Sequence, residues 1–572
     1  MSRFSSALRA VVVGAAVTVS ACSSASDSPI TTPGGTTTTT LTCTGAQTLS
    51  AGQVVTGLSG SSACVGGVSA SAEYALVAFN SDTSRTSTFS VSGTNVATPS
   101  ASSNLIPTSG AGALSASLNA IGSAAASTPL NGFEARLRMQ ERTVLTPLIP
   151  SARAWMRQRN TSRAAYDVIP SSVTTGQLLR LNANGNDACT SPIYRMGRVV
   201  AITSKAIIVA DTLNPTGGFT DAEYAAFGNT FDTVVDPLDR GAFGDPSDID
   251  GNGRVVIFFT STVNDLTPKT STSYVAGFFF SRDLFPTVAT TNFDACAGSN
   301  MGEMFYVMVP DPTRGGSFSK TNVITEVTGT LAHEYQHLIN ASRRMYVNTA
   351  AQDFEVTWLD EGLAHVAEEL LFYKESGLSP RQDIASSTIR SSTPTVNAFN
   401  NYASSNFGRY EEYLKNPTGY SVYADNDSLA TRGATWSFLR YAADRAGTTD
   451  GSVFYNLVNS TTTGIANLQN VFGTGVMGEI RDWGVSVLTD DLAGVSSTYS
   501  QPSWNFRNIF QTLDNTTLFP IATSSLTSSA QSVTLVRGAN AYLRFAVAAG
   551  GSASVQWTSA PTAVQFSLVR IK

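Results

Sequence analysis

Two histidines four residues apart, His333 and His337, constrain the fold of this chain more than any other feature of its sequence. They lie in the apolar segment Leu331-Ala332-His333-Glu334-Tyr335-Gln336-His337-Leu338-Ile339. An α-helix places positions i and i+4 on one face, so both imidazoles can reach one metal ion. Zinc accepts neutral imidazole nitrogens and keeps one position for water in catalytic sites. Glu334 is turned toward that water and the substrate, where it can accept a proton during hydrolysis.

The third and last histidine of the chain lies in a second informative segment, which predicts an amphipathic helix over residues 357–375. Its apolar residues at 359, 363, 366, 367 and 370 form one buried stripe. Glu361, near the start of this helix, is our candidate for a third zinc ligand, because carboxylates complete many catalytic zinc sites. His365 lies one turn further on the same face. It could be a third ligand instead, orient Glu361 or a ligand histidine, or stabilise the substrate oxyanion.

The two segments together resemble the gluzincin peptidases, in which a Trp-Leu-Asn-Glu-Gly-type helix supplies the glutamate ligand. The residues here are Trp358-Leu359-Asp360-Glu361-Gly362-Leu363-Ala364. In combination with Ala332-His333-Glu334-Tyr335-Gln336-His337-Leu338-Ile339-Asn340, they resemble the hyicolysin family of secreted neutral metallopeptidases, over about residues 175–510. The resemblance implies a zincin-like α+β fold, zinc bound by His333, His337 and Glu361, and Glu334 as the catalytic residue. In thermolysin-like enzymes an aspartate one turn after the ligand glutamate orients a ligand histidine. In this chain His365 stands at that place.

The N-terminus has the three-part layout of a secretory signal peptide. Arg3 and Arg9 supply the positive end, an apolar stretch follows over 11–17, and Val19-Ser20-Ala21-Cys22 has the pattern of a bacterial lipobox. We expect removal of residues 1–21 and lipidation of Cys22. The protein would then be exported and anchored to the cell envelope, at the outer membrane or the cell surface, through this lipid only. Later release of the protein from the envelope by proteolysis stays an open alternative.

Four cysteines remain after Cys22, and an even number in an exported chain predicts two disulfides. Three pairings are allowed by the sequence. We favour Cys43–Cys64 and Cys189–Cys296, because each pair falls inside one predicted domain.

The composition divides the chain into six parts. After the signal peptide come a flexible Ser/Thr-rich stalk (22–42), a small β-sandwich-like domain (43–115), an Arg-rich linker or pro-segment (116–173), the zinc metallopeptidase domain (174–520) and a C-terminal β domain (521–572). Within the peptidase domain, we predict helices over 219–233, 322–344 and 432–446 and strands over 198–202, 206–210, 255–259 and 304–309. The last of these strands, Met304–Val309, is expected at the sheet edge, where it would pair with an extended substrate.

A further pattern, Asp248-Ile249-Asp250-Gly251-Asn252-Gly253-Arg254-Val255, resembles the first half of a calcium-binding loop. Asp248, Asp250 and Asn252 bear oxygens at alternate positions, and Arg254 stands at the seventh. The bidentate glutamate expected at the twelfth position is absent, because Phe259 stands there. The same residues also suit a tight turn, so calcium and a structural turn both stay open.

The charge and the two candidate helices together define the functional alternatives. The net charge of −6 argues against a nucleic-acid partner, which would need a basic face. We expect a monomeric zinc endopeptidase that hydrolyses extracellular proteins or peptides. The alternative is a catalytically inactive surface lipoprotein on a peptidase-like fold, used for adhesion or carbohydrate binding. The flanking β domains favour that alternative, whereas an intact Glu334 argues against it.

Overall fold

The computed structural model describes residues 46–66, 69–99, 132–162, 169–269, 271, 274–424, 427–513 and 519–572. All the elements below belong to one compact unit, residues 43–572. The predicted signal peptide, Cys22, the stalk and Cys43 lie outside the described residues. Within the described ranges, no helix combines the length and the apolar character that a membrane span requires.

A six-stranded mixed sheet, in the order β5-β6-β7-β8-β10-β9, supports the candidate site. Its strands are β5 (Leu178–Asn182), β6 (Tyr194–Ile202), β7 (Ala206–Asp211), β8 (Val255–Phe259), β9 (Gly277–Phe279) and β10 (Met304–Val307). β7, β8 and β10 run parallel to one another, whereas β5, β6 and β9 run antiparallel to their neighbours. The predicted pairing of residues 198–202 with 206–210 is confirmed.

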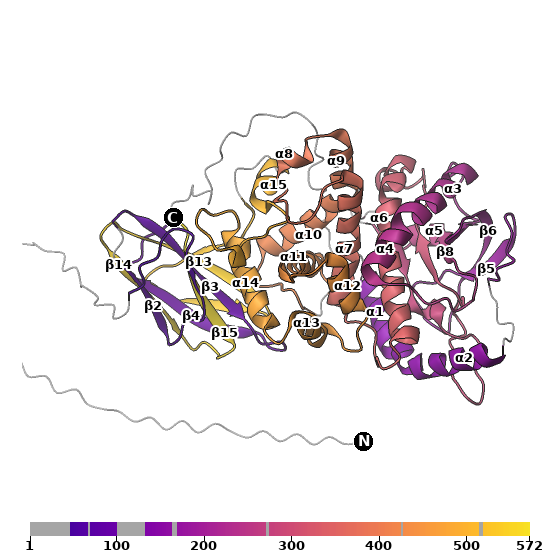
Figure 1. Cartoon of the computed structure of the whole chain (residues 1–572), viewed down its shortest axis with the longest axis horizontal. Helices are drawn as coiled ribbons and strands as arrows, with labels where there is room; N and C mark the ends of the chain where they lie inside the picture. Colours follow the sequence, from indigo (N-terminus) through magenta and orange to yellow (C-terminus); the bar gives the residue numbers. More distant parts are fainter. Residues whose placement is uncertain are drawn as a thin grey trace, which may run out of the picture. The chain divides into compact units, whose positions relative to one another are not determined.

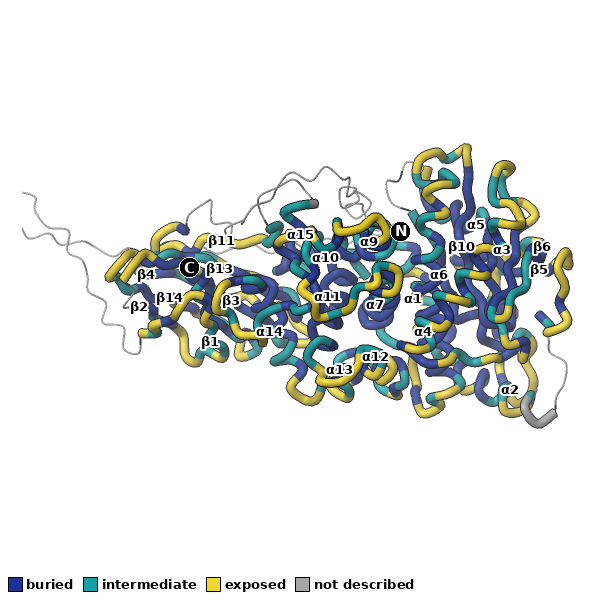
Figure 2. The backbone as a smooth tube through the Cα atoms, turned by 45° about the horizontal axis from the view of Figure 1, so that its top comes forward, coloured by how far each residue is buried: buried dark blue, intermediate teal, exposed yellow. Residues whose placement is uncertain are grey.

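The edge of this sheet next to β10 is formed by β9. All four residues of β10 are buried (Figure 2). β10 lies between β8 and β9 in the sheet. The prediction that Met304–Val309 forms the edge strand is therefore wrong. β9 is only three residues long, which is too short for a period-2 pattern to identify it from the sequence.

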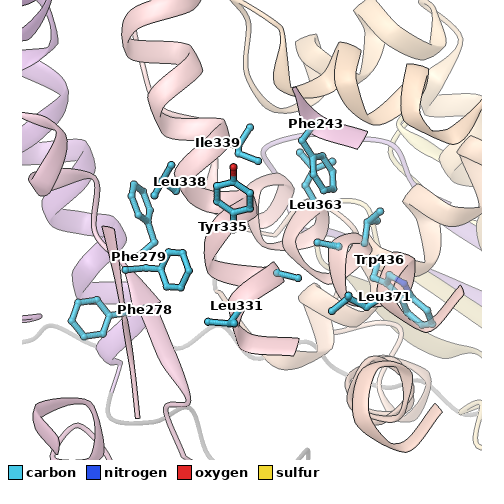
Figure 3. Close-up of a cluster of buried hydrophobic side chains, with 14 of the residues drawn as sticks. Phe243, Phe278, Phe279, Leu331, Tyr335, Leu338, Ile339, Leu363, Leu371 and Trp436 are labelled. Carbon is cyan, nitrogen blue, oxygen red and sulfur yellow. The ribbon is translucent and has the colours of Figure 1, made fainter. Parts of the chain in front are cut away.

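The two predicted active-site helices are present. They are α6 (Lys320–Ser342), which continues into a π-helical turn (Arg343–Val347), and α7 (Thr357–Ser376). Figure 3 shows apolar side chains of α6 packed between the sheet and α7. The sheet contributes Phe278 and Phe279, and α7 contributes Leu363 and Leu371. The side chains of α6 between them are Leu331, Tyr335, Leu338 and Ile339. Because both sides of α6 are covered, its polar side chains lie in a largely buried site.

Helices also precede α6. α3 (Asp221–Thr230), a π-helical turn (Phe231–Val235) and α4 (Asp236–Phe243) form the predicted helix near 219–233, and α5 (Ser261–Asn264) is a single turn. The Thr220 hydroxyl and the Glu223 carboxylate form a capping box at the start of α3. The disulfide Cys189–Cys296 is confirmed, and it joins the loop after β5 to the segment before β10.

After α7 the chain is mainly helical as far as residue 513. The helices are α8 (Ser386–Ile389), α9 (Thr393–Ala398), α10 (Ser404–Lys415), α11 (Leu429–Arg445), α12 (Asp450–Val458), α13 (Gly464–Phe472), α14 (Val476–Thr489) and α15 (Phe506–Leu513). Of these, only α11 was predicted, as 432–446. α10 and α11 pack against each other, and α11 also packs against α7.

Strands from both ends of the chain form one β-sandwich, with sheets in the orders β1-β15-β3-β13-β11 and β12-β4-β14-β2. The strands are β1 (Val54–Val55), β2 (Ser62–Gly66), β3 (Ala72–Asn80), β4 (Ser87–Thr94), β11 (Ser524–Ser525), β12 (Gln531–Leu535), β13 (Asn540–Val547), β14 (Ser552–Thr558) and β15 (Val564–Arg570). Figure 1 shows indigo strands β2, β3 and β4 among the yellow strands β13, β14 and β15. The prediction of two separate β domains, 43–115 and 521–572, is therefore wrong.

This sandwich is continuous with the helical part of the chain. β3 is buried along its whole length, with Leu76 in the core between the two sheets and Val77 in the larger core shared with the helices. The Tyr542 hydroxyl on β13 donates a hydrogen bond to the Gly484 carbonyl of α14 at 2.7 Å. A strand covered on both faces reads as a continuous apolar run, which explains the sequence of β3.

The described part of the Arg-rich segment is helical and belongs to the core. It contains α1 (Phe133–Gln140), a π-helical turn (Glu141–Leu145), a 3₁₀ turn (Thr146–Leu148) and α2 (Ile149–Ser162). Phe133 packs edge-to-face on Phe278 of β9, with ring centroids 5.5 Å apart. The Arg153 guanidinium donates to the backbone oxygen of Met345 at 2.7 Å. The segment that packs against the six-stranded sheet and α6 therefore begins at least as early as residue 132, ahead of the predicted domain boundary at 174.

Candidate metal centre

The two histidines of α6 and one carboxylate of α7 meet at one point. His333 Nε2 and His337 Nε2 are 3.2 Å apart. Glu361 Oε2 lies 3.5 Å from the first nitrogen and 3.8 Å from the second. Tetrahedral zinc with ligands at about 2.0–2.1 Å holds its ligand atoms about 3.3 Å apart. The three atoms therefore fit one zinc ion with small adjustments.

A carboxylate of α7 faces the other ring nitrogen of each histidine. Asp360 Oδ2 is 2.8 Å from His337 Nδ1. Glu368 Oε1 is 2.9 Å from His333 Nδ1. An ionised carboxylate can only accept a hydrogen bond, so Nδ1 carries the proton in both neutral rings and Nε2 keeps its lone pair. Both histidines are thus held in the tautomer that binds metal through Nε2.

Our sequence reasoning missed both of these orienting carboxylates. Asp360 stands directly before the predicted ligand Glu361, and Glu368 lies two helical turns after Asp360 on the same face, so the helical spacing was the available signal. Asp360 is itself held in place, because Asn340 Nδ2 of α6 donates to its Oδ1 at 2.6 Å. One helix therefore supplies the candidate third ligand and the partners of both histidines.

Buried carboxylates give this site an electrostatic preference for cations. Burial by itself lowers the pKa of His333, but its interactions with the carboxylates of Glu361, Glu368 and Glu334 outweigh burial and raise that pKa to about 10. Burial by itself raises the pKa of Glu361, but Arg432, His337, His333 and Arg138 together outweigh burial and hold that pKa well below its usual value. The negative charge that would favour a proton on His333 also favours a divalent metal ion at the same place.

Glu361 has ionic neighbours but no well-formed hydrogen bond. Arg432 Nη1 of α11 is 2.7 Å from Oε2, and Arg138 Nη2 of α1 is 3.7 Å from Oε1. Neither oxygen accepts a hydrogen bond from the described residues, although Glu361 is only 1% exposed. A buried carboxylate oxygen without a donor is costly, and a metal ion would satisfy it.

Glu334 lies on α6 beside the ligand pair and faces the edge strand β9. Its Oε2 accepts a hydrogen bond from the Phe279 backbone N–H at 2.7 Å. Two residues earlier, Gly277 approaches α6 so closely that an added Cβ would lie 2.6 Å from Thr330 Cγ2 and 2.8 Å from the Tyr306 carbonyl oxygen. The absence of a side chain at residue 277 thus allows β9 to reach Glu334.

His365 lies beside the candidate ligands. Its ring centroid is 4.9 Å from that of His333, and its Nδ1 is 3.2 Å from Glu368 Oε1, the oxygen that also faces His333. Burial, followed by the charge of Arg409, lowers the pKa of His365 to about 3, so the ring is neutral. His365, His333 and Glu368 also form an alternative group of three potential ligands. The ring is 0% exposed, which favours a role in orienting Glu368 over contact with a substrate oxyanion.

Gly362 brings α7 close to α11. An added Cβ would lie 2.4 Å from Thr435 Cγ2 and 3.1 Å from Leu439 Cδ1, both of α11. Gly362 therefore sets the approach of α7 to α11 and not its approach to the metal-binding helix α6, because a helical residue contacts only the neighbour that its own face meets.

The structure brings together only part of the predicted calcium loop. Asp248 and Asp250 lie close to each other, and Glu303, which the sequence did not suggest, joins them. The Asn252 side chain instead forms hydrogen bonds within the loop, since its Oδ1 accepts from the Arg254 N–H at 2.7 Å and its Nδ2 donates to Asp250 Oδ2 at 2.6 Å. The Arg254 Nε donates to the Thr203 carbonyl oxygen.

Comparison with known proteins gives one informative result. No protein-family model matches the chain. Over 155 residues the chain is 35% identical to the neutral metalloprotease ShpI of Staphylococcus hyicus. The match covers 27% of this chain and 32% of the Staphylococcus protein, so it spans about a third of that relative. The similarity supports a metallopeptidase function in general.

Proposed function

We propose that the chain is a zinc-dependent peptidase of the hyicolysin type, in which His333, His337 and Glu361 bind zinc and Glu334 is the general base. The observation that carries the proposal is the set of distances of 3.2, 3.5 and 3.8 Å among the three ligand atoms. The similarity to a metalloprotease supports it independently.

The chemistry that we propose divides between the metal and Glu334. A zinc ion held here would polarise the scissile carbonyl and make water a better nucleophile at neutral pH. Glu334 accepts a proton from the water as the water oxygen attacks the carbonyl carbon, and then passes the proton to the leaving amine nitrogen. The hydrogen bond from the Phe279 N–H to Oε2 fixes the orientation of the carboxylate and leaves Oε1 for the water.

The edge strand β9 supports an extended peptide as the substrate. Successive residues of a strand direct their backbone groups to opposite edges, and the Ala276 carbonyl accepts from Met308 beside β10. The backbone groups of Gly277 therefore face the other edge of β9, where a substrate strand can pair with them. Such pairing recognises the main chain of a peptide rather than a chain terminus, so we propose an endopeptidase of extracellular proteins or peptides.

We also propose that this peptidase is an exported monomer anchored to the cell envelope through Cys22. The lipobox pattern at residues 19–22 supports this location, and a Cys22→Ser variant should leave the membrane fraction.

The decisive experiment is hydrolysis of casein or a quenched peptide by the purified protein, together with measurement of its zinc content. Chelation should abolish hydrolysis and added zinc should restore it. Glu334→Gln should retain zinc, because Glu334 is not a ligand, while its turnover falls by a factor of about 10²–10⁴. A protein that binds zinc stoichiometrically but hydrolyses none of a broad set of proteins and peptides would instead support the inactive adhesion lipoprotein.

A further inference from the structure

Three carboxylates meet at the amino-terminal ends of the neighbouring strands β8 and β10. Asp248 and Asp250 lie in the loop before β8, and Glu303 stands directly before β10. β8 and β10 are parallel and pair Val256 with Met304, so the residues that precede the two strands lie side by side. One oxygen of each carboxylate lies within 4.8 Å of the others.

Glu303 occupies the place of the ligand that the loop sequence lacks. Its Oε1 accepts hydrogen bonds from the Ser247 hydroxyl and the Ile249 N–H, both at 2.8 Å, so the side chain is fixed against the loop. Its Oε2 has no hydrogen-bond donor among the described residues, although Glu303 is only 2% exposed. An ionised oxygen that is buried beside two other carboxylates is unfavourable unless a positive partner stabilises it.

Within the described ranges, protein groups compensate only part of this negative charge. Asp250 is 5% exposed, and its two oxygens accept hydrogen bonds from the N–H and the side-chain amide of Asn252. Arg159 of α2 lies nearby and lowers the pKa of Asp250, but burial and the charge of Glu303 outweigh it and raise that pKa to about 9. Arg159 supplies one positive charge against three carboxylates.

The chemistry of the three side chains selects the ion. All the candidate ligand atoms are carboxylate oxygens, which suit a hard cation rather than zinc or copper. Calcium accepts six to eight oxygens in flexible geometry, including backbone carbonyls and water, and an irregular loop can supply these. Magnesium requires near-ideal octahedral geometry, which a loop of this kind does not enforce.

We propose that Asp248, Asp250 and Glu303 bind one calcium ion, with Glu303 in place of the glutamate missing from the twelfth position of the loop. The ion joins the loop before β8 to the segment before β10. β10 pairs with β9 and is followed in the chain by α6, so calcium strengthens the part of the sheet against which the metal-binding helix packs.

The test is a titration with calcium chloride or magnesium chloride of the full chain, which is first freed of calcium by EGTA, then dialysed free of the chelator and resupplied with zinc. Isothermal titration should show one calcium ion bound, with a Kd of about 1 mM or tighter. The midpoint of thermal unfolding should rise by several degrees in calcium and much less in magnesium. An equal response to magnesium, or no saturable response to calcium up to ten times that Kd, would overturn the proposal.

Two variants locate the ion. Glu303→Gln and Asp250→Asn keep the side-chain shapes and should weaken calcium binding at least tenfold while zinc content stays stoichiometric. Asp294→Asn, at an exposed aspartate outside the cluster, is the matched control and should bind calcium like the wild type. Without added calcium, zinc-loaded Glu303→Gln should melt at or above the wild-type temperature, since it loses a carboxylate from a repulsive cluster. Calcium binding of wild-type strength in Glu303→Gln would refute the site.

Discussion

Replacement of Asp360 by Asn tests whether the orienting carboxylates tune the metal centre. In the structure Asp360 accepts from His337 Nδ1 at 2.8 Å and from Asn340 Nδ2 at 2.6 Å, so it fixes both the tautomer and the direction of the ligand ring. Loss of an outer partner of a ligand histidine usually lowers metal affinity about 10–100-fold, or about 1.4–2.8 kcal/mol. An asparagine oxygen can still accept one neutral hydrogen bond, so we expect the lower half of this range for Asp360→Asn and the upper half for Asp360→Ala.

The affinity is measured by competition of the protein with a chelating dye for zinc, and peptide hydrolysis is then measured at saturating zinc. Glu375→Gln, at an exposed carboxylate on the same helix, is the control and should match the wild type. Glu368→Gln should resemble Asp360→Asn, because Glu368 holds the other histidine. If Asp360→Asn folds normally and its zinc affinity stays within twofold of the wild-type value, the orienting role is refuted.

Two further predictions concern the third ligand and the disulfide. Glu361→Ala should lose zinc and activity together, whereas His365→Ala should keep near-stoichiometric zinc with a lower rate; zinc lost only in His365→Ala would point to the alternative group of His333, His365 and Glu368. Replacement of Cys189 and Cys296 by Ser opens a loop with a sequence separation of 107 residues and should lower the free energy of unfolding by about 4–5 kcal/mol in denaturant titration. An unchanged unfolding midpoint would contradict the second prediction.

The sequence predicted the site best where its pattern was long and local. The ends of α6 and α7 lie close to those of the predicted ranges 322–344 and 357–375. The prediction succeeded because an amphipathic stripe over five or more turns has few other interpretations. The i, i+4 spacing alone indicated that His333 and His337 share a face. The contact of Glu361 with both histidines depends on how two helices cross, which no local pattern encodes. The resemblance to a known family was needed to identify Glu361 as the candidate third ligand.

What the sequence did not predict depends on contacts between distant segments. β3 pairs with β13 and β15 across more than four hundred residues, so the strands of the sandwich were visible but their partners were not. Glu303 carries no signal of its own before β10, and it meets Asp250 only because β8 and β10 are adjacent. Arg138 reaches Glu361 from a segment that resembled a linker by composition.

The position of α7 against α11 controls the whole metal centre, because α7 carries Asp360, Glu361 and Glu368 together. Gly362→Ala would place a methyl group 2.4 Å from Thr435 Cγ2 and push the helices apart. We therefore expect zinc affinity to fall at least tenfold. Thr435→Ser offers a matched rescue, since it removes that methyl group but keeps the hydroxyl that donates to the Val422 carbonyl at 2.6 Å. The double variant should recover part of the affinity, whereas equal zinc affinity in Gly362→Ala and the wild type would show that this contact does not position the ligands.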